Sequence, residues 1–443
     1  MTRSKPFSGK QKKLQLQAKR EKHRQGPKEE KITPDKEGVE DAGFSGDLRT
    51  IFAKEPQWII DERKRDATRA LVLASDRANS QEIYKYGLSD GQNQPPIPLR
   101  PEWTKEMTPE ELEKLEETSF TTWLQMLQEQ CTVKAQDNIL INFYERNLQV
   151  WRQLWRVIEK SNVILHFADS RCPLLHLSHR LIETIHQHHP SKRVLIVLTK
   201  VDFIPIDRVH AWIEYLQARY DVPVIPYSRE RALECNPELL QVIGASSSQT
   251  NFMKARSEEL NEGTLTIGLV GEPNVGKSSF LNSIFLKKLV SVSATPGHTK
   301  HFQTHYYDHP EHFQQEMIEK ACFCDCPGVV FPRFNVPTAL QILFGSYPIA
   351  QTREPYSAIR FIAENCVPSL HEIYKLKKID EDDEWSPYTL SESYAAQRGF
   401  HVKGGKLDVF RAANLLLRDT LNGTKVILSF PPPEQDTRSN DSN

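Results

Sequence analysis

The stretch Gly271-Glu-Pro-Asn-Val-Gly-Lys-Ser278 decides the fold of this chain. It follows an apolar run, residues 265–270, that predicts a buried strand. It leads into residues 279–285, whose apolar positions recur at helical spacing. The pattern G-x-x-x-x-G-K-[ST] between a strand and a helix is the P-loop, which binds phosphate groups. A chance match in a glycine-containing turn is the alternative, and both flanks argue against it.

The P-loop pattern predicts a role for each of its residues. Its glycines let backbone N–H groups point at phosphate oxygens, and the helix N-terminus adds partial positive charge. Lys277 is expected to reach the β- and γ-phosphates of a nucleotide, and the Ser278 hydroxyl to ligate Mg²⁺. The residues expected to contact the nucleotide are Gly271, Glu272, Pro273, Asn274, Val275, Gly276, Lys277, Ser278 and Ser279.

Composition places the chain among soluble proteins with a large core. The 443 residues allow two or three domains, with 38% hydrophobic and 26% charged residues. No run of about eighteen apolar residues occurs and no signal-peptide core begins the chain, so we expect no membrane contact. The 7 cysteines lack C-x-x-C pairs, which favours free thiols in a reducing compartment. Cys322, Cys324 and Cys326 alternate as in a strand, and a metal site is the weaker alternative.

The net charge of −1 conceals a basic N-terminal segment. Residues 1–45 are dense in Lys and Arg up to Lys28 and nearly free of apolar side chains, so we expect a disordered arm. Its charge predicts binding to nucleic acid or targeting to the nucleus. A solvated tail without a partner is the alternative.

Strands and helices alternate through the middle of the chain. This alternation predicts an α/β fold, a mostly parallel sheet flanked by helices. The expected strands are 163–169, 194–198, 222–227, 265–270, 302–307 and 321–324. The expected helices are 178–186 and 207–220 (with Asp207 as N-cap), a segment starting at Thr108 and continuing through 120–127, and 142–157, 337–344, 356–364, 391–398 and 407–418. Residues 229–262 are expected to form a mixed connection.

The resulting domain plan has six parts. They are a basic arm (1–45), an irregular linker region (46–107) with a stiff proline-rich end at 94–101, a helical extension (108–160), the nucleotide-binding domain (161–330), a mainly helical C-terminal domain (331–430) and a disordered tail (431–443).

Two motifs downstream of the P-loop are typical of nucleotide switches. Asp325-Cys-Pro-Gly328 ends a predicted strand. As a D-x-x-G motif it would hold Mg²⁺ through Asp325 and contact the γ-phosphate through the Gly328 N–H, a contact that senses hydrolysis. Thr295-Pro-Gly-His-Thr299 lies between the two loops and offers a further hydroxyl ligand for Mg²⁺. Thr299 is our choice for that ligand, and Thr295 is the alternative.

A base-reading motif stands upstream of the P-loop. Thr199-Lys-Val-Asp202 resembles the N-K-x-D that recognises guanine. Asp202 would accept bonds from N1–H and the exocyclic amine of guanine, a pair that adenine does not supply. Lys200 would lie along the base, whereas Thr199 replaces Asn and makes only part of the bracing bonds, which predicts weaker nucleotide binding. For the second guanine-contacting loop Ser228 is our candidate, and residues 245–246 are the runner-up.

The order of these motifs is unusual. In ordinary GTPases the base-reading motif follows D-x-x-G, whereas here it precedes the P-loop. Loops at the C-terminal ends of parallel strands can be reached in several chain orders, so opening the chain after D-x-x-G keeps the site intact. Opening the chain after D-x-x-G also places this nucleotide-sensing loop next to a C-terminal extension. The nucleotide state could therefore move that extension.

Together the motifs resemble those of the circularly permuted GTPases of the YlqF/YawG type, which are associated with ribosome assembly. The resemblance rests on Asp169-Ser-Arg-Cys-Pro173, Thr199-Lys-Val-Asp202, Gly271 to Ser278, Pro296-Gly-His-Thr-Lys300 with Gln303, and Asp325-Cys-Pro-Gly328. Residues 5–13 and 146–155 resemble eukaryotic members. The resemblance covers most of the chain, least clearly residues 50–100, and Thr199 and Ser170 depart from the family's Asn and Ala.

The resemblance implies a slow GTPase switch with GTP/GDP and Mg²⁺ as cofactors. Lys277, Thr299 and Gly328 would be catalytic, and Ser278, Thr299 and Asp325 would hold Mg²⁺. A ribosomal precursor or ribosomal RNA would bind the basic arm and the terminal helices, in the nucleus or nucleolus with shuttling to the cytoplasm as an option. We expect a monomer.

Two residues predict how hydrolysis is controlled. Val329 follows Gly328 where many GTPases place a Gln that orients the attacking water, so we expect slow intrinsic hydrolysis and an activating partner or cation. Asn274 stands where related GTPases place a K⁺ ligand, which predicts faster hydrolysis in K⁺ than in Na⁺. A role in stabilising the loop is the alternative for Asn274.

Three other functions stay open at this point. A non-ribosomal signalling switch would use the arm only for targeting, and a nucleotide-binding scaffold would show negligible turnover. An ATPase is the least favoured, because the base-reading motif selects guanine.

Overall fold

The structure, a computed structural model, describes residues 51–72, 83–88, 93–136, 139–248, 264–290, 303–315 and 318–434. Its centre is a six-stranded sheet with the strand order β3-β2-β1-β4-β6-β5. The strands are β1 Val163–Asp169, β2 Arg193–Thr199, β3 Val224–Tyr227, β4 Thr264–Gly271, β5 Gln303–Tyr307 and β6 Lys320–Asp325. All pairings are parallel except that of β5 with β6, so the predicted α/β fold is confirmed.

The strand order explains how motifs that occur in a permuted order along the chain can still form one site. Counted from the P-loop strand β4 as the first strand and continued through the chain termini, the sheet has the order 2-3-1-4-5-6. This is the arrangement of a doubly wound sheet, in which loops at the carboxyl ends of the central strands form the ligand site. The permutation therefore changes the connections and leaves the edge where ligands bind unchanged.

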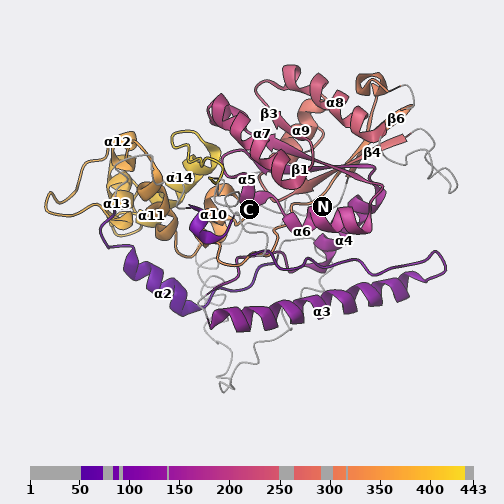
Figure 1. The fold of residues 1–443 in the computed structure, drawn as a ribbon. Coiled ribbons are helices and arrows are strands. Elements are labelled where there is room, and N and C mark those ends of the chain that lie inside the picture. Colours follow the sequence, from indigo (N-terminus) through magenta and orange to yellow (C-terminus); the bar gives the residue numbers. More distant parts are fainter. Residues whose placement is uncertain are drawn as a thin grey trace, which may run out of the picture. The chain divides into compact units, whose positions relative to one another are not determined.

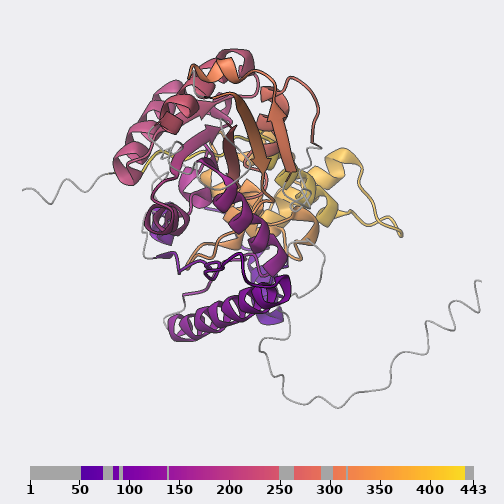
Figure 2. The same cartoon turned by 90° about the vertical axis from the view of Figure 1, so that its right-hand side faces the viewer.

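Alternating side chains of the strands face two separate cores. In β1, Val163, Leu165 and Phe167 face one core together with helices α8 (Ala232–Ser248) and α9 (Lys277–Ile284). Ile164 and Ala168 face the other, which contains α4 (Leu148–Lys160), α6 (His179–His188) and α7 (Ile206–Tyr220). Because both faces are covered, the central strands β1, β2 and β4 are buried along almost their whole length, as expected of a parallel sheet, whereas the edge strand β5 is largely exposed. Figures 1 and 2 show helices on both sides of the sheet.

The N-terminal extension packs against the second core. Its helices are α2 Gln57–Asp66 and α3 Pro109–Ala135, and α3 begins with the expected capping box between Thr108 and Glu111. The proline-rich run 94–101 is no free linker. The indole N–H groups of Trp123 and Trp155 donate to the carbonyls of Pro96 and Pro98 at 2.7 and 3.0 Å. Because prolines lack N–H groups, such a run forms few backbone ladders, and its carbonyls can accept hydrogen bonds from neighbouring side chains.

The C-terminal helices complete the same core. They are α10 Thr338–Phe344, α11 Tyr356–Asn365, α12 Leu370–Tyr374, α13 Pro387–Arg398 and α14 Val409–Asn422. In Figure 1 they gather beside the sheet, and α2 lies between them and α3. One core cluster holds residues from β1, α4, α10 and α14, so the helical segments are parts of the sheet's cover. The domain boundaries given above stay a prediction.

Several expected elements differ from the structure. Residues 142–147 are not helical: Asn142 and Glu145 donate backbone bonds to the carbonyls of Arg333 and Val330, both at 2.9 Å, and Asn147 caps α4 instead. Pro205, not Asp207, occupies the N-cap of α7. Helices α2 and α8 stand where irregular chain was expected.

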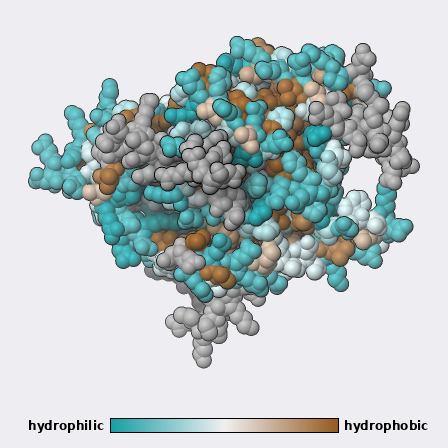
Figure 3. Space-filling model, in the orientation of Figure 1, coloured by the Kyte–Doolittle hydropathy of each residue, from teal (hydrophilic) through white to brown (hydrophobic). Residues whose placement is uncertain are grey.

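The structure also shows where the alternating cysteines lie and how polar the surface is. Cys322 and Cys324 lie on β6 and Cys326 follows it, so their alternation reflects a strand. No helix in the described ranges combines the length and apolarity that a membrane span needs. Hydrophilic residues dominate the face drawn in Figure 3, with small apolar patches between them. The basic arm 1–45 lies outside the described residues.

Candidate nucleotide-binding site

The predicted motifs meet at one edge of the sheet. Asp169 at the end of β1 is in register with Thr199 at the end of β2, and Thr199 with Tyr227 at the end of β3. On the other side, Phe167 pairs with Gly271 and Leu269 with Asp325. The base-reading loop, the P-loop and the D-x-x-G loop thus follow neighbouring strands at their carboxyl ends, where parallel sheets bind ligands.

The P-loop turns sharply from β4 into α9. Gly276 has φ +109° at the N-cap of α9, a conformation that side chains with a Cβ rarely adopt. Lys277 starts the helix, and its ammonium donates to the carbonyls of Gly271 and Glu272 at 2.9 and 2.7 Å. Burial lowers the pKa of Lys277, and nearby Asp325 opposes that shift. The lysine is therefore held over the loop, at the position that its predicted phosphate contact requires.

Asp325 is a buried carboxylate that the protein leaves unpaired. Its side chain is 0% exposed, and neither oxygen has a hydrogen-bond partner in the described parts of the chain. Burial raises its pKa to about 6, although Lys277 pulls in the other direction. A buried carboxylate without a partner in the described chain fits a hard cation such as Mg²⁺, which takes oxygen ligands.

The D-x-x-G loop lies directly on the P-loop. A Cβ on Gly328 would stand 2.7 Å from the backbone nitrogen of Pro273, so only glycine permits this approach. The N–H of Val329 donates to the Gly271 carbonyl at 3.2 Å. The Val329 side chain is 1% exposed and belongs to the core, which leaves no polar group at this position to orient water.

The base-reading loop braces the P-loop through a single hydroxyl. The Thr199 hydroxyl lies 2.5 Å from the Val275 carbonyl and 3.1 Å from the Ala168 carbonyl. One proton serves only one of these acceptors at a time, as expected where Thr replaces an Asn amide. Lys200 takes a left-handed conformation with φ +58°, and Asp202 follows it on the exposed face of a short 3₁₀ turn, η3 (Val201–Phe203).

A buried ion network beneath the base-reading loop was not assigned from the sequence. Arg171 and Lys200 both pair with Oδ2 of Asp169, each at 2.7 Å, and the side chains of Asp169 and Arg171 are 0% exposed. Burial alone would raise the pKa of the Asp169 carboxyl, but Arg171 and Lys200 hold it well below its usual range. The sequence contained a signal, since Asp169 and Arg171 are part of the D-x-R-x-P resemblance.

Arg171 also joins the sheet to the C-terminal helices. Its guanidinium donates to the carbonyls of Thr420 and Leu421, at 2.9 and 3.1 Å, in the last turn of α14. Carbonyls at a helix C-terminus lack partners within the helix and carry partial negative charge, so a cation is favourable there. Phe203, next to Asp202, packs against Gly423 at the end of the same helix.

The P-loop contacts the helical layer as well. The amide nitrogen of Asn274 donates to the Gly345 carbonyl at 2.8 Å, and the Ser346 hydroxyl donates to the Glu272 carboxylate. Gly345 caps the C-terminus of α10, the helix that follows the D-x-x-G loop. Burial raises the pKa of Glu272 to about 7, although Arg333 and the Ser346 bond oppose the shift. The P-loop side chains of Glu272 and Asn274 thus hold the end of α10.

The second guanine-contacting loop has one candidate near the site. Ser228 follows β3 at the nucleotide edge, is 0% exposed, and its hydroxyl has no partner in the described residues. Residues 245–246 lie near the end of α8, next to Gly244, which approaches Phe313 on the far side of β5. The structure thus brings Ser228 to the motifs and leaves the runner-up away from them.

Thr295 and Thr299 lie outside the described residues, as does the whole stretch 296–300. Gln303, which closes that motif, begins β5 and is in register with Asp325. Gln303 therefore lies beside Asp325, the first residue of the D-x-x-G loop.

Comparisons with known proteins agree with this geometry. Residues 266–366 match the family model described as 50S ribosome-binding GTPase. Guanine nucleotide-binding protein-like 1 is 30% identical in both Rattus norvegicus and Homo sapiens, and the alignment covers 98% of this chain and 86% of each relative. Large subunit GTPase 1 of Schizosaccharomyces pombe is 33% identical over 76% of this chain and 58% of its own length.

Solved structures give a more distant likeness. A GDP-bound YlqF matches with a TM-score of 0.39 and 20% identity over 63% of this chain and 99% of its own. The GNP-bound YlqF from T. maritima matches with a TM-score of 0.40 and 18% identity over 64% of this chain and 99% of its own.

Proposed function

This chain belongs to the circularly permuted GTPases that include guanine nucleotide-binding protein-like 1, and we propose that it is a slow GTP-dependent switch in assembly of the large ribosomal subunit. It binds GTP and hydrolyses it to GDP. The observation that carries the proposal is the contrast at the nucleotide edge: Lys277 is held over the P-loop, while the buried Asp325 has no partner among the residues that the structure describes.

The site's residues divide the chemistry among them. The loop N–H groups and Lys277 bind the phosphates, Asp202 reads the guanine edge, and Gly328 contacts the γ-phosphate. Mg²⁺, held by Ser278, Asp325 and Thr299, would neutralise phosphate charge. Phosphate oxygens would replace the Gly271 and Glu272 carbonyls as acceptors for Lys277. Its ammonium therefore needs only a short displacement to act.

Slow intrinsic hydrolysis follows from the burial of Val329. Its side chain packs in the core, so the water that attacks the γ-phosphate lacks the protein group that usually orients it. An activator or the bound precursor would have to supply that group. Single-turnover measurement should give a rate well below that of a self-sufficient GTPase, and a fast rate without any partner would remove this part of the proposal.

The contacts to α10 and α14 supply a route from nucleotide to partner. Glu272 and Asn274 hold the end of α10, and Arg171 holds the end of α14. A nucleotide that moves the P-loop or the D-x-x-G loop therefore acts on helices that packing connects directly. We infer that these helices, with the basic arm, form the surface that changes affinity for the precursor.

Binding to a ribosomal precursor rests on the relatives and on charge. The matching family model and one relative are named for the ribosome or its large subunit. The basic segment 1–45 would contact ribosomal RNA, a binding mode that salt weakens steeply, and would place the protein in the nucleus or nucleolus.

Sedimentation of tagged protein in cell extract tests this proposal. Wild-type protein should migrate with large-subunit particles, RNase should release it, and Lys277→Ala should change its distribution. A protein that stays in the light fractions under every condition would leave the GTPase intact and favour a signalling switch.

A potassium ion is a smaller addition to the proposal. The Asn274 amide nitrogen is used by Gly345, so K⁺ would take the amide oxygen of the same side chain. Hydrolysis should then be faster in K⁺ than in Na⁺, and Asn274→Asp should keep that preference. Equal rates in both salts would assign Asn274 to loop stability alone.

A further inference from the structure

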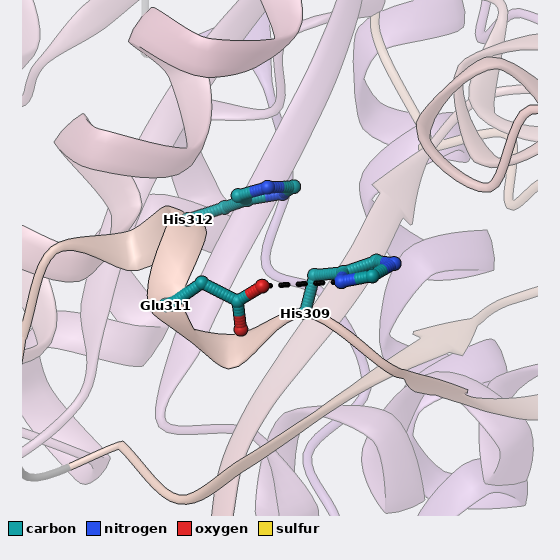
Figure 4. A group of neighbouring side chains, drawn as sticks. All are labelled: His309, Glu311 and His312. Carbon is teal, nitrogen blue, oxygen red and sulfur yellow. Dashed lines mark hydrogen bonds and ion pairs between the residues drawn. The ribbon is translucent and has the colours of Figure 1, made fainter.

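Three metal-binding side chains meet on the turn that follows β5. His309, Glu311 and His312 each offer one ligand atom, and these atoms lie within 4.8 Å of one another (Figure 4). Nδ1–H of His309 donates to Oε1 of Glu311 at 3.1 Å. The imidazoles of His309 and His312 are stacked, with centroids 5.2 Å apart. The nucleotide site uses none of these residues.

The turn that carries them is rigid. It is the 3₁₀ helix η5 (Pro310–Phe313), anchored by Phe313, which is 0% exposed in the core beneath α8. A Cβ on Gly244 of α8 would stand 2.1 Å from the Phe313 carbonyl, so the two elements are in close contact. Tyr307 packs edge-on against Phe313, with centroids 5.9 Å apart. Ligands on a fixed element need little reorganisation on binding.

A second contact orients His312. The Tyr307 hydroxyl lies 2.8 Å from Nδ1 of His312, which leaves Nε2 of that ring for a ligand bond. Metal-binding histidines commonly make such a bond with their other nitrogen, and it fixes the ring and its tautomer. Here Tyr307, whose partly buried ring packs against the core, supplies it.

The chemistry of the donors selects a class of ion. Two imidazoles and one carboxylate are the donor set of open zinc sites, in which water takes the fourth position. With metal–ligand distances of about 2.0–2.1 Å, neighbouring donors of a tetrahedron lie roughly 3.3 Å apart. The His309–Glu311 separation of 3.1 Å is already close to that value. Mg²⁺ prefers oxygen ligands only and should not compete.

We propose that His309, Glu311 and His312 form a surface site for a divalent transition-metal ion of the zinc type. The site is separate from the nucleotide. Strand β5 begins opposite Asp325 and runs antiparallel to β6, so the turn after Tyr307 lies at the far end of the sheet. A bound ion would link three side chains of the β5–β6 connection and so stiffen that turn. Its open fourth position would remain available to water or to an external donor.

Equilibrium dialysis of the full-length protein against Zn²⁺ tests the site, because it counts bound metal directly. We expect one ion lost in His309→Ala and in His312→Ala, with GTP affinity unchanged. Tyr307→Phe keeps the packed ring and should weaken Zn²⁺ by about tenfold through the lost hydroxyl. Millimolar Mg²⁺ should displace nothing.

The chain offers a matched control. His186 and His188 are exposed on α6, away from this turn, and the double variant His186→Ala/His188→Ala removes two surface imidazoles without touching the cluster. It should keep the ion that His312→Ala loses. The proposal is overturned if the two sets of variants lose Zn²⁺ equally, or if His312→Ala binds as wild type does. Circular dichroism of each variant shows that a lost ion does not reflect a lost fold.

Discussion

Two buried aspartates flank the P-loop strand, and the protein treats them in opposite ways. Asp169 ends β1 on one side of β4 and Asp325 ends β6 on the other, and both are 0% exposed. Asp169 is paired with Arg171 and Lys200, whereas Asp325 has no partner among the described residues. The pKa of Asp169 is held well below its usual range by those cations, while burial raises that of Asp325 to about 6.

This difference separates a structural charge from a functional one. An isolated carboxylate in an apolar site costs several kcal/mol, and proteins keep such groups mainly where function requires them. Asp169 pairs with Arg171, and the Arg171 guanidinium donates to the Thr420 carbonyl in α14. Its charge therefore helps to connect the base-reading loop to that helix. Asp325 has no such partner among the described residues, as the proposed Mg²⁺ site requires. Each prediction below is a way to break or sharpen this contrast.

The largest expected effect is on folding, from Asp169→Asn. The change leaves the Arg171 guanidinium buried without its carboxylate, and removing one partner of a buried ion pair typically costs about 3–5 kcal/mol. Urea unfolding should show this loss, together with weaker packing of α14. Asp325→Asn is the matched control, since it makes the same chemical change at an equally buried aspartate on the other side of β4. Equal losses in the two variants would erase the distinction.

Asp325→Asn should instead act on catalysis. Without the carboxylate proposed to hold Mg²⁺, GTP hydrolysis should fall on the order of 100-fold, as when one charge-stabilising group is removed. The nucleotide-free protein should be as stable as wild type at pH 7 or more so, because a buried unpaired charge has been removed. Single-turnover hydrolysis and urea unfolding on the same preparation measure both effects. A stability loss as large as that of Asp169→Asn would mean that Asp325 is structural.

The two aspartates should also respond to pH with opposite signs. The folded pKa of Asp325 lies at about 6, above its ordinary 3.8, so its contribution to stability is full below pH 3.8 and is lost as pH rises through 6, by about 3 kcal/mol. The folded pKa of Asp169 is depressed, so its contribution is present above its ordinary value and is lost on acidification.

Unfolding free energies of wild type and both variants between pH 4 and pH 8 test this. The advantage of Asp325→Asn over wild type should grow from pH 4 to about pH 6 and then level off, whereas the deficit of Asp169→Asn should stay nearly constant down to pH 4 and shrink only on further acidification. Mg²⁺ with GDP should abolish the advantage of Asp325→Asn. If the unfolding free energies of the two variants changed with pH in the same way, the opposite roles assigned to Asp169 and Asp325 would be contradicted.

The smallest effect is expected from Ser228→Ala. The hydroxyl has no partner in the described chain, so its removal should change the free energy of unfolding by no more than about 0.5 kcal/mol. If Ser228 contacts guanine, GDP affinity should fall about fivefold, the value of one net hydrogen bond of roughly 1 kcal/mol. Ser246→Ala, on α8, is the control and should leave affinity unchanged. A reversed result would make the runner-up loop the base contact.

The sequence predicted the parts of the site that rest on local rules. The P-loop, the D-x-x-G loop and the T-K-x-D loop each follow a strand whose apolar run is visible, and the strand order brings them together as the permutation argument required. Asp325 lies at the carboxyl end of β6, next to the P-loop strand, and its nucleotide role stays a prediction. Its lack of a partner could not be known, because that depends on which distant side chains fail to reach it.

Other parts depended on contacts that no local pattern encodes. Helix α8 contains Pro237, Gly244 and a serine-rich end, all weak helix formers, and its pairing with the sheet core overrides them. Helix α2 is short and polar, with only Ile60 buried. The proline-rich run 94–101 offers free carbonyls, and only the tertiary fold brings Trp123 and Trp155 to them. The role of Arg171 likewise rests on α14, some 250 residues later.

The most direct test is nucleotide affinity with and without Mg²⁺, measured with a fluorescent GTP analogue on wild type and Asp325→Asn. The account predicts that Mg²⁺ tightens binding to wild type at least about tenfold but leaves Asp325→Asn nearly unchanged, and that GDP displaces the probe while ADP does not. Equal Mg²⁺ dependence in both proteins would show that Asp325 does not bind the cation. Displacement by ADP as readily as by GDP would contradict the guanine site itself.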